Sequence, residues 1–340
     1  MSSKRGLTLG KFAPFHKGHQ FLIETALSEM DELIVIAYNC PETTSVPLNI
    51  RAGWIRRLYP DIQVIEAWDG PTEVGDTPEI KKKHEDYILN RLKLQGITHF
   101  YSSEFYGEHM SLALGAVNRM VDYDRKTVPI SGTQIRKDTF ACHEYLHPWV
   151  YRDLITNIVF LGAPSTGKTT LASRLAQEYD TVWMPEYGRE YWENHQVNRR
   201  LSLEQLAEIG SEHLNLEEAL LYQANRYLFT DTNAITTYMF SLYYHNTVVP
   251  QLAELANRVA LRYDLVFVCD VDIPYDDTWD RSGDVNRCIF QKQIISDLII
   301  RKIPFFLVQG EMEIRVQYVK RILEKYRKYE NWLSLFVERQ

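Results

Sequence analysis

The sequence lacks several features that mark specialised classes of protein. It has only four cysteines, Cys40, Cys142, Cys269 and Cys288, and none of them forms a C-x-x-C pair. This argues against a disulfide framework or a cysteine zinc site, and it suits a reducing cytoplasm. No apolar run is long enough to span a membrane, and no signal-peptide pattern precedes the first expected strand. We therefore expect a cytoplasmic protein without a membrane segment.

The sequence also lacks an excess of positive charge. It carries 38 Lys and Arg against 45 Asp and Glu, for a net charge of −7 at pH 7. A domain that binds nucleic acid usually presents a broad basic surface, so we expect no DNA partner. A local phosphate site remains possible, because a few well-placed groups are enough to bind an anion.

The composition is typical of a soluble globular protein, with 45% hydrophobic and 24% charged residues. A chain of 340 residues is long for a single core, so two domains are expected. Apolar runs such as Leu33–Ala37 and Ile158–Leu161 alternate with helical patterns, which predicts parallel α/β sheets in both halves. We place the domains at 1–145 and 146–340, joined by an aromatic-rich connector around 139–156.

The individual elements follow from the same patterns. We expect strands over 7–9, 33–37, 62–65, 98–101 and 117–121 in the first half, and over 158–161, 179–184, 226–230, 264–269 and 304–308 in the second. Helices are expected over 51–58, 79–94 and 311–329, with another beginning at Ser202, where Ser202 and Gln205 have the spacing of a capping box.

The most specific motif lies at the start of the second half. The segment Gly162–Thr169 fits the P-loop pattern G-x-x-x-x-G-K-[ST], with an apolar strand pattern before it and a helical pattern after it. In this motif Lys168 can reach the β- and γ-phosphates and Thr169 can ligate Mg²⁺. The predicted ATP- or GTP-binding loop comprises Gly162, Ala163, Pro164, Ser165, Thr166, Gly167, Lys168, Thr169 and Thr170.

Two motifs in the first half together match the HxGH and ISxTxxR signatures of the nucleotidylyltransferase superfamily. They are His16–His19, after the first expected strand, and Ile130–Arg136, far downstream. Histidines at a helix N-terminus can donate to phosphates, and an arginine supplies fixed positive charge. The resemblance, over residues 5 to about 140, implies catalysis by His16, His19 and Arg136. It implies an ATP site formed by Gly10, Lys11, Phe12, His16, Gly18, His19, Ser131, Thr133 and Arg136.

Other interpretations of these residues remain open. The histidines could be metal ligands or helix caps in an α/β domain without catalysis, and Lys11 could be an ordinary surface lysine. Trp54 could stack on a flat ring such as nicotinamide, or it could pack in the core on an amphipathic helix.

Acidic residues follow two expected strands of the second half. Glu186 could accept the proton of an acceptor hydroxyl or hold sugar hydroxyls. Asp231 stands where a Walker B acid would lie near Mg²⁺, although it could also be a strand-end cap. We therefore predict catalytic roles for Lys168, Glu186 and Asp231, and a magnesium site at Thr169 and Asp231.

A polar segment further along could close over the phosphates. Arg281 and Arg287 lie in the stretch 280–287, which contains a glycine, and they would bind the transferring phosphate if this stretch were a lid. The alternative is a solvated loop with surface charges.

The combination of a nucleotidylyltransferase-like half and a P-loop half with the motif E-Y-[GA]-R-E-Y, here Glu186–Tyr191, resembles the NadR family over nearly the whole chain. The resemblance implies a Rossmann-like nucleotidylyltransferase domain followed by a P-loop kinase domain. The kinase would phosphorylate nicotinamide riboside with ATP. The other domain would join the nicotinamide mononucleotide (NMN) to AMP, making NAD and releasing pyrophosphate, and both reactions would use Mg²⁺. Substrate-binding residues would be Trp54, Glu186, Tyr187 and Arg189.

The chain departs from the family pattern in two ways. The first strand starts near Gly6, which leaves no room for the DNA-binding helix-turn-helix of some members, so we expect no repressor role. Asn233 stands two residues after Asp231, where an acid is expected; Asp270 or Glu186 could replace it. Two other functions stay open, namely action on another nucleoside or a pantetheine- or riboflavin-type acceptor, and a slow sensor of ATP and NAD. A homo-oligomer is possible, as for many soluble enzymes.

Overall fold

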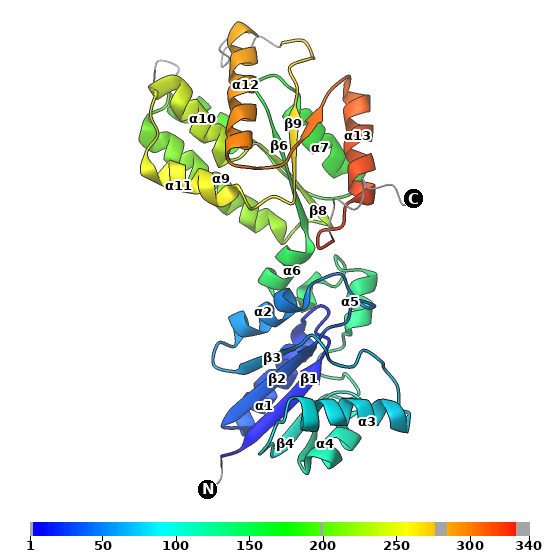
Figure 1. The fold of residues 1–340 in the computed structure, drawn as a ribbon. Helices are drawn as coiled ribbons and strands as arrows, with labels where there is room; N and C mark the ends of the chain where they lie inside the picture. The colour runs from blue at the N-terminus through cyan, green and yellow to red at the C-terminus, as the bar shows by residue number, and fades with distance from the viewer. Residues whose placement is uncertain (1–2, 198–199, 276–283, 331–340) are drawn as a thin grey trace. The chain divides into compact units, whose positions relative to one another are not determined.

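The computed structural model describes residues 3–197, 200–275 and 284–330, and the chain separates into two compact units, Met1–Tyr151 and Arg152–Gln340 (Figure 1). Each unit is an α/β fold around its own parallel sheet, which confirms the predicted fold class. A search of the described helices finds none that is both long and apolar enough to cross a membrane.

The first unit contains a five-stranded parallel sheet in the order β3-β2-β1-β4-β5. The strands are β1 (Arg5–Gly10), β2 (Glu32–Tyr38), β3 (Gln63–Ala67), β4 (His99–Ser102) and β5 (Val117–Met120). The strand order changes direction between β1 and β4, which pair with each other in parallel. In open α/β sheets, ligands bind beyond the carboxyl ends of the strands at such a switch point.

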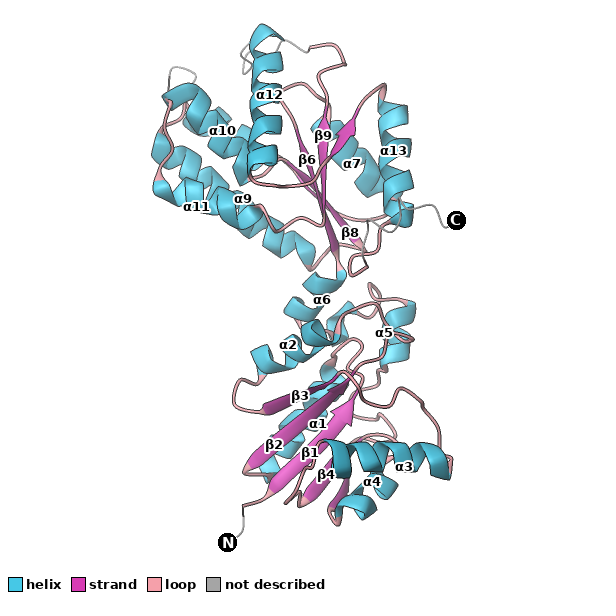
Figure 2. Cartoon of the chain, viewed as in Figure 1, coloured by secondary structure: helices cyan, strands magenta, loops and turns pink. Residues whose placement is uncertain are grey.

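The helices of the first unit cover this sheet (Figure 2). They are α1 (Lys17–Glu29), α2 (Leu48–Leu58), α3 (Pro78–Asp86), α4 (Gly107–Leu114) and α5 (Gly132–Lys137), with a 3-10 turn at His143–Tyr145; α6 (Pro148–Leu154) contains the division between the units. The single helix predicted over 79–94 is wrong in its second half. There the chain forms a π turn, Tyr87–Arg91, which brings the adjacent Tyr87 and Ile88 into the same core.

The second unit contains five parallel strands in the order β10-β9-β6-β8-β7. The strands are β6 (Thr156–Leu161), β7 (Trp183–Met184), β8 (Tyr227–Asp231), β9 (Leu265–Cys269) and β10 (Phe306–Val308). Every residue of the central strand β6 is buried, because helices pack on both faces of the sheet. The strand predicted over 179–184 is much shorter: the preceding helix ends at Glu178, with Tyr179 as its C-cap, and Asp180 has a φ of 48°, so the chain turns before β7 begins.

Seven helices of the described chain belong to the second unit alone, and alternate residues of β6 contact opposite layers of them. Ile158 and Phe160 pack with α7 and α13, whereas Val159 and Leu161 pack with α10, α11 and α12. The helices are α7 (Lys168–Glu178), α8 (Tyr187–His195), α9 (Leu203–Leu221), α10 (Ala234–His245), α11 (Pro250–Val259), α12 (Asp284–Ile300) and α13 (Met312–Lys325). The predicted capping box at Ser202 and Gln205 is confirmed at the start of α9.

A buried polar cluster joins α9 to the sheet of the second unit. Glu217 is fully buried, and its carboxylate accepts hydrogen bonds from Asn157 Nδ2 (2.7 Å), Arg262 Nε (2.8 Å) and Tyr263 OH (2.7 Å). The donors come from two distant places in the sequence, Asn157 in β6 and the adjacent Arg262 and Tyr263 just before β9, so the cluster fixes the position of α9 beside both strands.

This cluster gives a stability prediction. Arg262→Met leaves the Glu217 charge buried without its cation, which typically costs about 3–5 kcal/mol. We expect a large fall in the thermal unfolding midpoint at neutral pH, measured by circular dichroism. Arg174→Met is the control, because Arg174 forms exposed pairs with Glu178 and Glu313 and should change the midpoint little. Equal effects of the two substitutions would contradict a stabilising role for the cluster.

Candidate active sites

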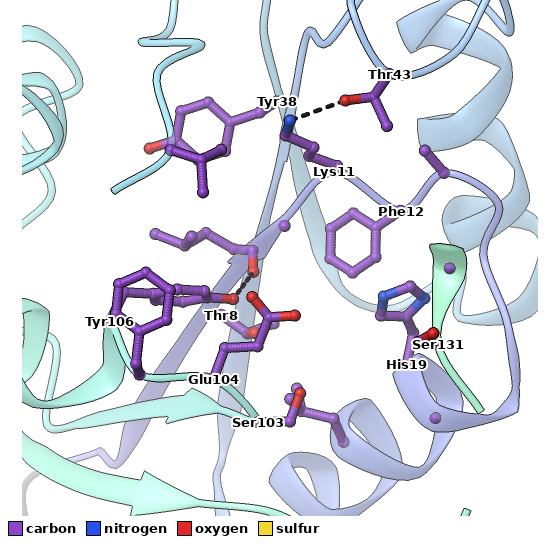
Figure 3. A pocket seen from close by; sticks show the side chains of 18 of the residues that line it. Thr8, Lys11, Phe12, His19, Tyr38, Thr43, Ser103, Glu104, Tyr106 and Ser131 are labelled. Atoms are coloured by element: carbon purple, nitrogen blue, oxygen red, sulfur yellow. Dashed lines mark hydrogen bonds between the residues drawn. The ribbon is translucent and has the colours of Figure 1, made fainter. Parts of the chain in front are cut away.

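A cavity of about 600 Å³ opens at the carboxyl ends of the strands of the first unit. It lies at the switch point, where residues after β1 and β4 meet the start of α1 and the start of α5. Both predicted motifs contribute to its wall. In Figure 3, His19 and Ser131 lie together, and Tyr106 lies across the cavity from them. The structure therefore brings the two distant motifs to one place.

The two histidines of the first motif are held by backbone hydrogen bonds. His16 is the N-cap of α1, and its Nδ1 accepts from the backbone N–H of Gly18 at 3.1 Å. The Nδ1 of His19 accepts from the backbone N–H of His16 at 3.3 Å, and the two rings stack with centroids 3.7 Å apart. Since a neutral imidazole that accepts at Nδ1 carries its proton at Nε2, each ring keeps an Nε2–H to donate to a ligand.

The surroundings keep both histidines neutral. Burial, followed by the positive charges of Arg125 and Arg136, lowers the pKa of His16 to about 4. Burial and the neighbouring His16 and Arg125 lower the pKa of His19 well below its usual value. Hydrogen-bond donation and positive charge therefore come from different groups, the imidazoles and the guanidiniums.

The second motif is tied to the loop before the first. Ser131 is the N-cap of α5 and accepts from the backbone N–H of Gln134 at 3.2 Å. Arg136 donates to the backbone carbonyl of Ala13 at 2.5 Å and to Thr133 Oγ1 at 3.1 Å. A Cβ at Gly132 would lie 3.0 Å from Arg136 Nη1 and 3.2 Å from that carbonyl of Ala13, so a side chain there would crowd both partners of this hydrogen bond.

The other predicted residues of the first site divide into two groups. Gly10, Lys11, Phe12 and Gly18 line the cavity, and Lys11 Nζ contacts Glu42 (2.6 Å) and Thr43 (2.9 Å), the latter visible in Figure 3. Trp54 does not line it. Its side chain is 4% exposed on the buried face of α2, so the structure places it in the core and not against a substrate ring.

Sequence reasoning missed several charged residues on the cavity wall, among them Arg125 and Glu104. Arg125 and Glu104 both line the cavity and face each other at 3.6 Å. The turn carrying Arg125 is held by Asp122, whose carboxylate accepts three backbone N–H groups, those of Lys126, Thr127 and Val128. Neither residue lies in a recognised motif, so only the fold shows that they belong to the site.

A second cavity, of about 490 Å³, lies in the second unit. All the predicted P-loop residues except Ala163 line it, together with Glu186 and Arg189. The loop needs its first glycine: Gly162 has a φ of 140°, and a Cβ there would lie 2.6 Å from the carbonyl oxygen of Cys269. Lys168 is buried and donates to the carbonyl of Ala163 at 2.9 Å.

Two buried side chains from distant helices hold the P-loop from behind. Gln291 of α12 accepts from the backbone N–H of Ala163 (2.8 Å) and donates to the carbonyl of Cys269 (3.0 Å). Arg315 of α13 donates to the carbonyl of Thr166 (2.8 Å) and also pairs with Asp272. No local pattern marks these residues, because they act through the loop and lie more than a hundred positions from it.

Asp231 lies at the end of β8, directly beside the P-loop. Its Oδ2 accepts from the hydroxyl of Thr169, and its buried Oδ1 has no hydrogen-bond partner among the residues that the structure describes. Burial, followed by the nearby charge of Glu186, raises the pKa of Asp231 to about 6. His213, also missed from sequence, is buried against it, with Nε2 3.4 Å from the Asp231 carbonyl oxygen.

Three further candidates, Glu186, Tyr187 and Asp270, differ in their positions relative to the second cavity. Glu186 is the residue before α8 and pairs with Arg189 at 3.4 Å. Tyr187 packs against the hydrophobic cluster of α8 and α9 and does not line the cavity. The carboxylate of Asp270 accepts from the backbone N–H of Val271 and from Nε2 of Gln309 (2.7 Å), which directly follows β10.

Asn233, at the position where an acid near the metal was expected, is the N-cap of α10. Its side chain caps α10 by accepting from the backbone N–H of Ile235 at 2.9 Å, and it is buried. It therefore faces the helix backbone and is not part of the cavity wall.

The predicted lid role is wrong for one of the two arginines, Arg287. Arg287 lies in α12, not in a loop, and its buried guanidinium donates to the carbonyl of Ile273 at 2.9 Å. It does not line the second cavity. Arg281 lies outside the described residues.

Known protein families match each half of this chain, and known proteins match most of its length. Residues 7–138 match the cytidylyltransferase-like family, and residues 157–315 match the AAA domain family. The trifunctional NAD biosynthesis/regulator protein NadR of Escherichia coli (strain K12) is 28% identical, over 90% of this chain and 79% of its own. The protein of the same name from Salmonella typhimurium (strain LT2) is also 28% identical, over 89% of this chain and 78% of its own.

Solved structures agree on the fold. A crystal structure of NadR protein in complex with NAD and AMP-PNP has a TM-score of 0.55 and 20% identity, and covers 95% of this chain and 96% of that one. A second, of NadR protein in complex with NR, has a TM-score of 0.55 and 22% identity, and covers 91% and 90%.

The histidine geometry gives a first prediction for this region. Because the pKa of His16 is lowered to about 4, the ring should remain neutral, with its proton on Nε2, at pH 6. ¹⁵N-edited NMR of histidine-labelled, ligand-free protein reports the tautomer directly. A His16 signal that titrates near the ordinary histidine pKa of about 6.5 would contradict the proposed electrostatics.

Asp231 gives a second prediction. Folding raises the pKa of Asp231 to about 6, so above that pH the ionised carboxylate lowers the free energy of unfolding. This loss of stability disappears as the pH falls toward the pKa that Asp231 has in the unfolded chain. Asp231→Asn should therefore raise the thermal unfolding midpoint at pH 8, in the absence of nucleotide, and change it little near pH 4. The control Glu193→Gln removes an exposed carboxylate from α8 and should have little effect at either pH. A lower midpoint for Asp231→Asn at pH 8 would contradict this account.

Proposed function

We propose that this chain is a member of the NadR family that makes NAD in two consecutive phosphorus-transfer reactions. The second unit phosphorylates nicotinamide riboside with ATP, and the first joins the resulting NMN to AMP from a second ATP. The observation that carries this proposal is the presence of two separate cavities. Each is built around its own phosphate-binding motif, and each lies at the carboxyl edge of its own parallel sheet.

In the kinase reaction, the 5′-hydroxyl oxygen of the riboside forms a bond to the γ-phosphorus of ATP, and the bond from that phosphorus to the β-phosphate oxygen breaks, releasing ADP. The P-loop N–H groups and the N-terminus of α7 bind the phosphates. Lys168 exchanges its Ala163 carbonyl acceptor for a phosphate oxygen. Glu186, on the cavity wall, accepts the hydroxyl proton.

The residues beside the P-loop fit a magnesium ion. Mg²⁺ is usually held by one or two carboxylates together with substrate phosphates and water, so it needs no dense protein cage. Indeed, no cluster of three or more His, Cys, Asp or Glu suited to a metal occurs in the described part of the chain. The unpartnered Asp231 Oδ1 and the adjacent Thr169 hydroxyl are the groups that would hold the ion. When bound, it would neutralise charge on the phosphate oxygens.

In the adenylyl transfer, a phosphate oxygen of NMN forms a bond to the α-phosphorus of ATP, and pyrophosphate leaves. This reaction requires stabilisation of negative charge and no protein nucleophile. The Nε2–H groups of His16 and His19 can donate to phosphate oxygens without adding charge, while Arg136 and Arg125 supply the positive charge. Ser131 and Thr133 provide further hydroxyl groups at the same edge of the cavity.

The two-site proposal predicts that the activities can be removed one at a time. Lys168→Ala should abolish phosphorylation of the riboside and leave NAD formation from NMN intact. His19→Ala should do the reverse, so that NMN accumulates from the riboside. Both are measured by mass spectrometry of the products, with circular dichroism to confirm folding. Loss of both activities in either folded variant would contradict two independent sites.

The cap at α10 predicts the behaviour of Asn233. Asn and Asp cap helices about equally well, so Asn233→Asp should leave the kinase rate unchanged. Asn233→Ala should lower stability by about 1 kcal/mol, because the Ile235 N–H loses its acceptor. A clear rise in the kinase rate of Asn233→Asp would show instead that this position serves the metal.

A further inference from the structure

One buried hydroxyl on the wall of the second cavity has no hydrogen-bond partner in the described part of the chain. The side chain of Thr236, in the first turn of α10, is 4% exposed and lines the cavity. Its Oγ1 makes no hydrogen bond to any residue that the structure describes. Leaving a buried hydroxyl unpaired is costly, so such a group inside a binding cavity suggests that a ligand supplies the missing partner.

A second buried threonine, Thr230, lies outside the cavity and serves for comparison. Thr230 of β8 is also fully buried, and its Oγ1 likewise lacks a partner among the described residues. Thr230, however, does not line the cavity. Thr230 and Thr236 therefore have the same side chain and similar burial, but only Thr236 can be reached by a ligand in the cavity. This makes Thr230 a matched control.

The position of Thr236 along α10 indicates which part of a ligand it meets. Thr236, Phe240 and Tyr244 are spaced by four residues and all line the cavity, so they form one face of the helix, about 12 Å long. Thr236 lies at the end nearest Asp231 and the P-loop, whereas the two aromatic rings lie one and two turns further away. The hydroxyl is thus at the end of α10 that follows Asp231, and the aromatic surface lies further along the helix.

The turn before α10 holds this arrangement in place. Thr232 has a φ of 66°, an uncommon conformation for a β-branched residue, and its backbone N–H donates to the carbonyl of Phe160 at 3.0 Å. Asn233 then caps the helix. The start of α10 is therefore anchored to β6, the strand that leads into the P-loop, so Thr236 keeps a fixed distance from the phosphate-binding groups.

We propose that Thr236 Oγ1 hydrogen-bonds a ribose hydroxyl of the nucleoside acceptor and thereby selects for ribosides over deoxyribosides. This inference rests on the proposed kinase function. In a nucleoside, the sugar lies between the 5′-oxygen, which must reach the γ-phosphate, and the base. The same order runs along α10, from the P-loop to Thr236 and then to Phe240 and Tyr244. A threonine hydroxyl both donates and accepts, so it complements a sugar hydroxyl.

The test compares Thr236→Val with Thr230→Val, two substitutions that replace a buried hydroxyl by a methyl group of similar size. For Thr236→Val we expect KM for nicotinamide riboside to rise about tenfold, the loss expected for one hydrogen bond, with KM for ATP unchanged. Thr230→Val should leave both constants unchanged, and Thr236→Ser should restore the wild-type KM. Neither valine variant should lower the thermal unfolding midpoint, because neither removes a hydrogen bond made by the free protein.

The 2′-deoxy and 3′-deoxy analogues of the riboside identify the partner. With the analogue that lacks the contacted hydroxyl, wild type and Thr236→Val should have KM values within about twofold of each other. A KM for Thr236→Val that matches Thr230→Val, or an equal penalty on the riboside and both analogues, would overturn the inference and leave the kinase function standing. Failure of the wild type to phosphorylate the riboside would overturn both.

Discussion

Both phosphate-binding regions depend on cationic side chains that donate to backbone carbonyls. Arg136 binds the Ala13 carbonyl and Arg51 the Lys11 carbonyl in the first unit, whereas Lys168 and Arg315 bind the carbonyls of Ala163 and Thr166 in the second. These bonds keep positive charge beside the loops of the ligand-free protein, although Lys168 must exchange its carbonyl acceptor when a phosphate binds. Preorganisation of this kind matters because donors already in place need no reorganisation when negative charge develops in a transition state.

The two units meet the same demand with different chemistry. The first uses side chains, namely two neutral imidazoles that donate from Nε2 and guanidiniums that carry the charge. The second uses the backbone of a glycine-containing loop, with a buried lysine and a carboxylate whose raised pKa reflects its burial. An acceptor that gains a phosphate in the second unit can then be bound by the guanidiniums of Arg125 and Arg136 in the first cavity, which gives the two reactions a chemical order.

Local sequence was sufficient where a short motif determines its own geometry. The histidine pair and the capping box at Ser202 make their hydrogen bonds within a few residues, and the lysine of the P-loop donates to the nearby carbonyl of Ala163. It was insufficient where the partner comes from elsewhere: Arg125, Gln291 and Arg315 act through contacts with distant parts of the chain. For Trp54 the helical pattern left two interpretations open, and the structure supports the core position; the burial of Arg287 was not predicted. The shortened strand at Trp183 and the π turn at Tyr87 likewise follow from tertiary constraints on where a helix ends.

The central claim is that one chain carries two different phosphorus-transfer sites that act in sequence, and the most direct test is the stoichiometry of products. The chain is incubated with ATP, Mg²⁺ and either nicotinamide riboside or NMN, and ADP, pyrophosphate and NAD are quantified by ³¹P NMR and mass spectrometry. The account predicts one ADP and one pyrophosphate for each NAD made from the riboside, and pyrophosphate without ADP when NMN is supplied. NAD formed from the riboside without ADP, or no NAD from NMN, would contradict it.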